Sequence, residues 1–225
     1  MKKSSGIWIS FLSIISVFLI LTSSCKKNDD DTIKDTDGNV YHSVKIGSQE
    51  WMVENLKTTK YNDGTSIPLI TDSLEWLNLI TPGYCWYNND APAYSSTYGA
   101  LYNWYAVNSG KLAPKGWHVP TDAEWTILTD FLGGLNVAGG KMKESGYKYW
   151  EIPNNGATNE SGFTALPGGF RNIDFGQINT FGWYWTATDH NAYNAWGRIL
   201  RNTSKGIVCD VGQNQMGRSI RCVRD

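Results

Sequence analysis

The sequence predicts an α+β fold: a single domain with a mixed or largely antiparallel sheet, two helices and a long loop region. Three observations support this class. Apolar and polar residues alternate near both ends of the mature chain, at 40–54 and from 183 onwards. Helical spacing with a capping signal lies between these stretches. A long segment rich in Gly, Asn and Pro, 148–169, separates the helices from the later strands. Segregated helices and strands are typical of α+β domains.

Residues 1–24 have the organisation of a bacterial lipoprotein signal peptide. Two lysines precede an apolar run, Ile7–Leu21, which is too short for a lasting membrane span but suits a signal sequence. The small residues before Cys25 resemble a lipobox, although Thr22 stands where the commonest lipobox has a larger aliphatic residue. We therefore expect acylation of Cys25 and attachment to the membrane through it. The alternative is an ordinary cleaved signal followed by a coincidental cysteine.

Residues 25–34 are expected to form a solvated tether, with the domain proper at 35–225. The charged run after Cys25 contains no apolar residue and cannot bury itself. Its acidic cluster, Asp29–Asp31, resembles the export tag of surface lipoproteins in Bacteroidota. The expected location is the outer membrane, lipid-anchored and facing the cell surface. The periplasmic face of the outer membrane is the alternative.

The composition of the chain excludes one class of partner and indicates how the domain packs. The net charge is −1, so we expect no nucleic-acid partner. The 11 Trp and 23 Gly residues indicate short strands and tight turns around aromatic packing. Apart from Cys25, the chain has three cysteines. Cys209 and Cys222 fall on strands predicted to be neighbours, so we expect a disulfide between them and a buried free thiol at Cys85.

The domain is expected to open with a turn and a hairpin. The run Asp35-Thr-Asp-Gly-Asn39 resembles half of a calcium loop, but the twelfth position is Ile46, where a carboxylate is needed. Calcium is therefore not supported by a complete motif, we expect no cofactor, and the metal content stays open. Alternation at 40–46 and 49–54 predicts two strands joined by Gly47-Ser48.

The later elements follow in order along the chain. A short strand is expected at 84–87 and a first helix at 98–107. Thr121 and Glu124 form a capping-box pattern that predicts a second helix to Leu132, ended by two glycines. Four strands are expected at 183–188, 195–201, 206–211 and 218–224, and the two ends of the domain should pair in one sheet.

Five segments, in order, carry a resemblance to a known family. They are D-T-D-G-N-V-Y at 35–41 with V-K-I-G-S-Q-E-W-M-V-E-N-L at 44–56, Y-G-A-L-Y-N-W at 98–104, G-W-H-V-P-T-D-A-E-W at 116–125, G-F-T-A-L-P-G-G-F-R at 162–171, and S-I-R-C-V-R-D at 219–225. Together they resemble the major paralogous domain first described in Fibrobacter, over nearly all of 35–225. The P-T-x-A-E-W core is also similar to the formylglycine-generating enzymes, which implies a C-type-lectin-like fold. Ala113 stands where relatives often carry Cys, which leaves Cys85 without a clear partner.

The resemblance does not imply that this protein has the activity of the formylglycine-generating enzymes. Formylglycine-generating enzymes use two closely spaced cysteines near the C-terminus to bind copper, whereas Cys209 and Cys222 are 13 positions apart. The three histidines, at 42, 118 and 190, have no metal-ligand spacing, and we expect His118 to be a structural hydrogen-bond donor. No nucleophile elbow occurs, and helix capping explains the carboxylates at 122 and 124. The sequence therefore predicts a protein that is not an enzyme.

A binding module for glycan, extracellular polymer or protein fits the sequence best. Sugars are bound by aromatic faces together with amide and carboxylate groups. One candidate set lies in the long loop: Trp150, Glu151, Asn154, Asn155, Asn159 and Glu160. The second set lies in the later strands: Trp183, Tyr184, Asp189, His190, Asn191 and Tyr193. The alternatives are a structural envelope protein, or an accessory or enzymatic subunit acting on extracellular polysaccharide.

Overall fold

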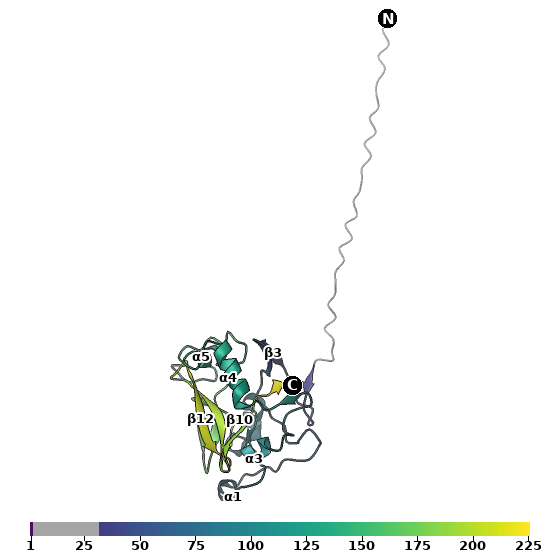
Figure 1. Cartoon of the computed structure of the whole chain (residues 1–225), viewed down its shortest axis with the longest axis vertical. Coiled ribbons are helices and arrows are strands. Elements are labelled where there is room, and N and C mark those ends of the chain that lie inside the picture. Colours follow the sequence, from purple (N-terminus) through teal and green to yellow (C-terminus); the bar gives the residue numbers. More distant parts are fainter. Residues whose placement is uncertain (2–31) are drawn as a thin grey trace. The chain divides into compact units, whose positions relative to one another are not determined.

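The computed structural model describes Met1 and residues 32–225 (Figure 1). The predicted signal peptide, Cys25 and most of the tether lie outside the described residues. Residues 32–225 form one unit. That unit begins earlier than expected, because Ile33 and Lys34 form strand β1 (Ile33–Lys34) with the Ile33 side chain buried, although the sequence placed both in the tether. No helix in the described part of the chain is long and apolar enough to cross a membrane.

The domain is mixed α+β, with mostly antiparallel sheets, as the sequence predicts. Its helices are α1 (Ser73–Leu77), the 3-10 helix η2 (Tyr87–Asn89), α2 (Ala91–Tyr98), α3 (Trp104–Val107), α4 (Asp122–Phe131) and α5 (Ala138–Met142). Besides β1, its strands are β2 (Val40–Tyr41), β3 (Ser43–Ile46), β4 (Gln49–Met52), β5 (Tyr84–Cys85), β6 (Leu101–Tyr102), β7 (Trp117–His118), β8 (Gly168–Arg171), β9 (Phe175–Ile178), β10 (Phe181–Asn191), β11 (Asn194–Arg201), β12 (Ile207–Gln213) and β13 (Val223–Arg224).

The two ends of the domain meet in one four-stranded sheet, in the order β3-β4-β13-β7. Val223 of the last strand pairs antiparallel with both Trp51 and His118. The predicted hairpin is confirmed, with Ser43 to Ile46 paired to Met52 to Gln49 across the Gly47 turn. The predicted pairing of the chain ends is therefore also confirmed.

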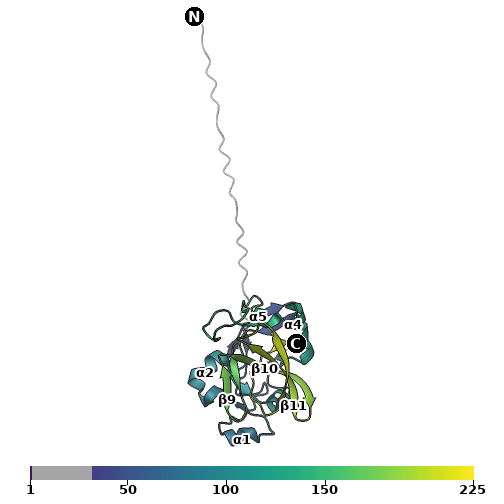
Figure 2. The same cartoon turned by 90° about the vertical axis from the view of Figure 1, so that its left-hand side faces the viewer.

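The larger sheet has five strands in the order β12-β11-β10-β8-β9. Figure 2 shows three of them, β9, β10 and β11. Its contacts are antiparallel except for the short parallel pairing of β10 with β8. Three of the four predicted late strands correspond to β10, β11 and β12. The fourth is regular only at its end, because residues 217–219 make isolated bridges to other segments before β13 begins.

The first predicted helix, at 98–107, is wrong. The helix α2 ends at Tyr98, β6 follows, and α3 begins after the cap residue Asn103. Gly99 causes the break, because its φ is +73° and a Cβ there would lie 2.6 Å from the Leu56 carbonyl oxygen. The backbone at Gly99 passes too close to the Asn55–Leu56 segment, which follows β4, for the helix to continue.

The second predicted helix is confirmed as α4. The Thr121 hydroxyl accepts a hydrogen bond from the Glu124 amide, and the Glu124 carboxylate accepts one from the Thr121 amide at 2.8 Å, which completes the capping box. The inner face of α4 buries Trp125 and Leu128. The Trp125 ring lies 5.0 Å from Trp51 and 5.7 Å from Phe163, so this helix closes one aromatic core.

Four arginines are almost completely buried: Arg171, Arg198, Arg218 and Arg221. The guanidinium groups of Arg198 and Arg218 meet carboxylates, those of Asp122 and Asp210. The other two donate mainly to main-chain carbonyls and lie against aromatic rings. These cations therefore crosslink loops to sheets inside the domain, where desolvation makes each lost partner costly.

The predicted disulfide between Cys209 and Cys222 is wrong. Both cysteines are free, as is Cys85, which is buried as predicted. Cys209 is exposed on β12, whereas Cys222 lies buried just before β13, in the other sheet. Burial raises the pKa of the Cys222 thiol to about 12, so this cysteine behaves as an apolar core residue.

Candidate functional site

Two of the long-loop candidates are core residues and not exposed ligand groups. Trp150 is 1 % exposed, and its indole N–H donates to the Ala165 carbonyl at 2.9 Å. Asn154 is 6 % exposed and donates to the carbonyls of Glu144 and Gly146. Both side chains hold the loop closed, which corrects the expectation that they face a ligand.

The remaining long-loop candidates are more accessible but are used in local structure. The Asn155 amide donates to the Thr203 carbonyl, and Asn159 bonds both the amide and the hydroxyl of Thr164 across a tight turn. Glu160 forms a surface ion pair with Lys141 at 3.0 Å. Together these contacts favour a structural role for the long loop.

A buried cation anchors this loop. Lys143 is completely buried, and its ammonium donates to the carbonyls of Asn155, Arg201 and Ser204 at 2.9–3.0 Å. Burial lowers its pKa to about 8, so it is still largely protonated at neutral pH. An internal cation thus joins the loop to the turn between β11 and β12. The position of Lys143 in the sequence does not indicate this anchoring role, because a lone Lys after a helix is normally exposed.

The second candidate set is divided between two places. Asp189, His190, Asn191 and Tyr193 lie at the tip of the β10–β11 hairpin, and Tyr193 is 77 % exposed. The side-chain oxygen Oδ1 of Asn191 accepts hydrogen bonds from the Tyr193 main-chain amide and from the Asn194 side chain. The His190 ring packs edge-on against Trp196 at 5.1 Å. The structure brings these residues together, but the contacts described here are made within the hairpin itself.

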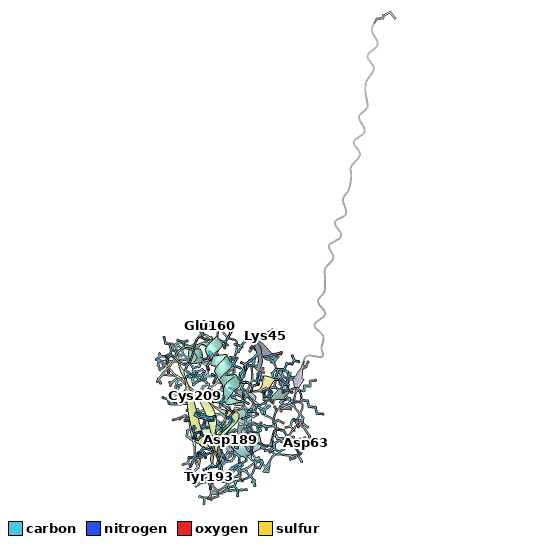
Figure 3. All side chains as sticks on the ribbon, viewed as in Figure 1. Lys45, Asp63, Glu160, Asp189, Tyr193 and Cys209 are labelled. Carbon is cyan, nitrogen blue, oxygen red and sulfur yellow. The ribbon has the colours of Figure 1, made fainter. Side chains whose placement is uncertain are left out.

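The two predicted sets do not form one site. The long loop bonds to Asn202 and Thr203, at the far end of β11 from the hairpin tip. At about 3.4 Å per residue, the eight residues of β11 separate the two places by more than 20 Å. In Figure 3, Glu160 and Tyr193 lie at opposite ends of the domain, with Asp189 nearer to Tyr193.

Trp183 belongs to a third place, which we call the aromatic face: the half-buried side chains Phe170, Phe181 and Trp183 on β8 and β10. Because β8 and β10 are parallel neighbours in register, Phe170 and Trp183 lie side by side, with ring centroids 5.3 Å apart. Phe181 lies two residues before Trp183 on the same strand, with its ring stacked at 6.1 Å and 20°. Tyr184, the neighbouring candidate, points to the other side and is buried.

Polar groups surround the aromatic face. The indole N–H of Trp183 donates to the exposed Gln177 side chain at 2.9 Å. Arg201 lies 5.5 Å from the Phe181 ring, and Arg218, held by Asp210, lies 4.9 Å from the Trp183 ring. Because Arg218 is almost completely buried, the groups that can meet a ligand here are the Gln177 amide and the half-buried Arg201. Aromatic rings beside such polar groups are suited to stacking on sugar rings while bonding their hydroxyls. In the sequence, the spacing of Phe181 and Trp183 indicates this arrangement, because residues two apart in a strand lie on the same face of the sheet.

A polar cleft of about 390 Å³ contains several carboxylates. Its lining residues are Lys45, Ser48, Gln49, Glu50, Glu124, Val223, Arg224 and Asp225. A hydrogen bond from Ser43 and the nearby Arg224 lower the pKa of Glu50. Burial opposes ionisation of Glu124, but bonds from Thr121 and His118 outweigh it and lower its pKa. Neither group is therefore suited to act as a general acid at neutral pH.

His118 lies between two of these carboxylates, in the structural hydrogen-bonding role predicted for it. Its Nδ1 is 2.8 Å from Asp225 and its Nε2 is 2.8 Å from Glu124. Burial opposes protonation, but the hydrogen bonds and charges of Asp225 and Glu124 outweigh it and raise the pKa of His118 above its ordinary 6.5. The ring therefore joins β7, α4 and the last residue of the chain.

This arrangement predicts a pH-dependent contribution to stability. Because the folded state raises the pKa of His118, its contribution is fully present below about pH 6.5 and is lost as pH rises through the folded-state value. We expect His118→Gln to lower the free energy of unfolding by about 1 kcal/mol at pH 5, because the pair is partly solvated, and by less at pH 8.5. Denaturant unfolding of both proteins at the two pH values measures this. An equal loss at both would contradict a charge-based contribution.

Among the described residues, no group of three His, Cys, Asp or Glu side chains is placed to hold a metal ion.

The fold and its surfaces define a class of protein: an α+β module with an arginine-crosslinked interior and an aromatic sheet face. Comparison of the sequence with known protein families identifies the family within this class. Residues 44–224 match the family described as Fibrobacter succinogenes major domain, and the chain belongs to that family. No curated protein and no solved structure matches the chain significantly.

Proposed function

We propose that this protein is a lipid-anchored, non-enzymatic binding module of the outer membrane, displayed at the cell surface, that holds extracellular polysaccharide on its aromatic face. The aromatic face is the observation that carries this proposal, because it offers three neighbouring rings that are only half-buried. Aromatic stacking on the apolar faces of sugar rings is a general way to bind glycans.

The surroundings of the face support a glycan more than an apolar ligand. Gln177 offers an amide and Asp210 a carboxylate, both of which pair with hydroxyl groups. The proposed lipid anchor at Cys25 would keep such a module at the membrane. A C-type-lectin-like arrangement of the domain, implied by the resemblance to formylglycine-generating enzymes, is part of this proposal and fits the pairing of the chain ends and the long loop.

The proposal is tested by polysaccharide binding of the full chain in detergent micelles, by affinity electrophoresis with and without calcium. We expect Trp183→Ala to weaken binding about tenfold or more, because a central aromatic contact is worth roughly 2 kcal/mol. Trp183→Phe, which keeps a ring, should retain part of the affinity. The melting temperature of each variant shows whether the fold is preserved.

Two variants control for location. Phe131→Ala removes an aromatic ring that is 64 % exposed on α4, away from the aromatic face, and should bind like the wild type. Tyr193→Ala tests the hairpin tip. Loss of binding in Tyr193→Ala with full binding in Trp183→Ala would move the site to the hairpin. Absence of binding across a broad panel would leave a structural envelope role, and cleavage of the polysaccharide would favour an enzymatic subunit.

A further inference from the structure

Arg201 differs from the other five arginines of the chain in the partners of its guanidinium group. Each of the others donates hydrogen bonds to oxygen atoms of the protein: Arg171, Arg198, Arg218, Arg221 and Arg224. The guanidinium of Arg201 has no hydrogen bond or ion pair to any residue that the structure describes. A guanidinium is a donor only, so a ligand that meets Arg201 must supply the acceptor.

The strand pairing holds Arg201 beside the aromatic face. Arg201, at the end of β11, lies directly opposite Phe181 of β10, so both side chains are on the same face of the sheet. The guanidinium carbon lies 5.5 Å from the centre of the Phe181 ring, and the Trp183 ring is stacked on that ring at 6.1 Å. A ligand on the aromatic face therefore meets the guanidinium group as well as the rings.

The two terminal nitrogens of Arg201 are the donors that such a ligand can reach. The Nε atom is buried without a hydrogen-bond partner, whereas Nη1 and Nη2 are not buried. Because neither terminal nitrogen has a partner within the described part of the protein, both face solvent from a half-buried side chain. The parallel N–H groups of these two nitrogens fit the two oxygens of a carboxylate, and this charged pairing is stronger than a bond to a neutral hydroxyl.

The charges around this end of the aromatic face favour an anion. Asp210 is paired with Arg218 and lies four residues, about 14 Å, along the sheet from Arg201. Glu151 comes close to the end of β11 through its main chain, but it forms no ion pair with Arg201. The buried ammonium of Lys143 donates to the Arg201 carbonyl at 2.9 Å and adds positive charge. No carboxylate of the described residues neutralises either of these two cations.

We propose that the polysaccharide held on the aromatic face contains uronic acid residues, whose carboxylates pair with the terminal nitrogens of Arg201. This inference rests on the proposed function and names the class of sugar that the same site takes. The Gln177 side chain supports it, because its oxygen accepts from the Trp183 indole and its NH2 group is left to donate to a second oxygen of the sugar. A uronic acid offers an apolar ring surface to the aromatic groups and a carboxylate to the guanidinium.

Calorimetric titration of the full chain in detergent micelles tests the proposal. The probes are polygalacturonate, alginate and hyaluronan, each compared with its methyl ester, which keeps the sugar ring and removes the charge. We expect at least one acid to bind about tenfold more tightly than its ester, because a hydrogen-bonded charge pair contributes that much. Arg201→Gln should abolish this preference, whereas Trp183→Ala should weaken the binding of acid and ester alike.

Two further variants separate the role of Arg201 from net charge. Arg224→Gln removes the same charge from the other sheet, where Arg224 pairs with Glu50, and should keep the preference for the acid. Arg201→Lys should keep only part of it, since an ammonium lacks the two parallel N–H groups that match a carboxylate. The melting temperature of each variant shows whether it folds, and the comparison of acid with ester in the wild type needs no variant.

Three outcomes would contradict the proposal in different ways. Equal binding of acid and ester by the wild type would overturn the assignment of uronic acid and leave the proposed function in place. Binding of dextran sulfate as tight as that of the acids, and lost in Arg201→Gln, would show a site for any anion and would also overturn it. Absence of binding to these polymers and to a panel of neutral polysaccharides would overturn the proposed function together with this inference.

Discussion

Arg221→Met should lower the free energy of unfolding by about 3–5 kcal/mol, because it removes a buried cation and leaves its partners unpaired. The Arg221 guanidinium is completely buried and donates to the Asn55 side chain and to the carbonyls of Met52, Phe163 and Thr164. It also lies 4.3 Å from the Phe163 ring. One side chain thus joins β4 to the end of the long loop.

Denaturant unfolding followed by tryptophan fluorescence measures this effect. Arg224→Met is the matched control, since Arg224 is half-exposed and pairs with Glu50 at the surface, where the loss should be under about 1 kcal/mol. Arg221→Lys should not restore stability, because one ammonium has three donors at a single point, whereas the separate nitrogens of the guanidinium reach four different acceptors. A loss below about 1 kcal/mol in Arg221→Met would show that its partners find other donors.

Lys143→Met should lower the free energy of unfolding by about 3 kcal/mol, because it removes the buried ammonium that donates to three main-chain carbonyls, those of Asn155, Arg201 and Ser204. The substitution keeps the length and apolar stem of the side chain, so the loss reports on the ammonium. The carbonyls of Asn155, Arg201 and Ser204 belong to two segments, so their separation should open the long loop locally.

Hydrogen exchange distinguishes this local opening from general destabilisation. We expect the amides of Gly140 and Asn155, which bond to Lys205 and Asn202, to lose protection first. Lys141→Met is the control, because Lys141 pairs with Glu160 at the surface. Unchanged protection of both amides in Lys143→Met would contradict the anchoring role.

The candidate site was only partly predictable. Trp183, Asp189, His190 and Asn191 reach the surface or its margin as expected, but Trp150 and Asn154 are buried. A loop rich in Asn and Gly resembles an exposed ligand loop in sequence. Whether its polar groups face solvent depends on which distant carbonyls they meet, and sequence spacing does not encode those contacts.

Features that depend on local chemistry could be predicted from the residues alone. The capping box at Thr121, the Gly47 hairpin turn and the alternation in the late strands each follow from residues within a few positions, and the α+β class follows from their order. The other features depend on contacts between residues far apart in the chain. Gly99 interrupts a helical pattern because Leu56 lies against it, and Cys209 stays apart from Cys222 because their strands join different sheets. The buried charges of Lys143 and Arg221 are tolerated only where carbonyls from distant segments converge, because desolvation would otherwise exclude them.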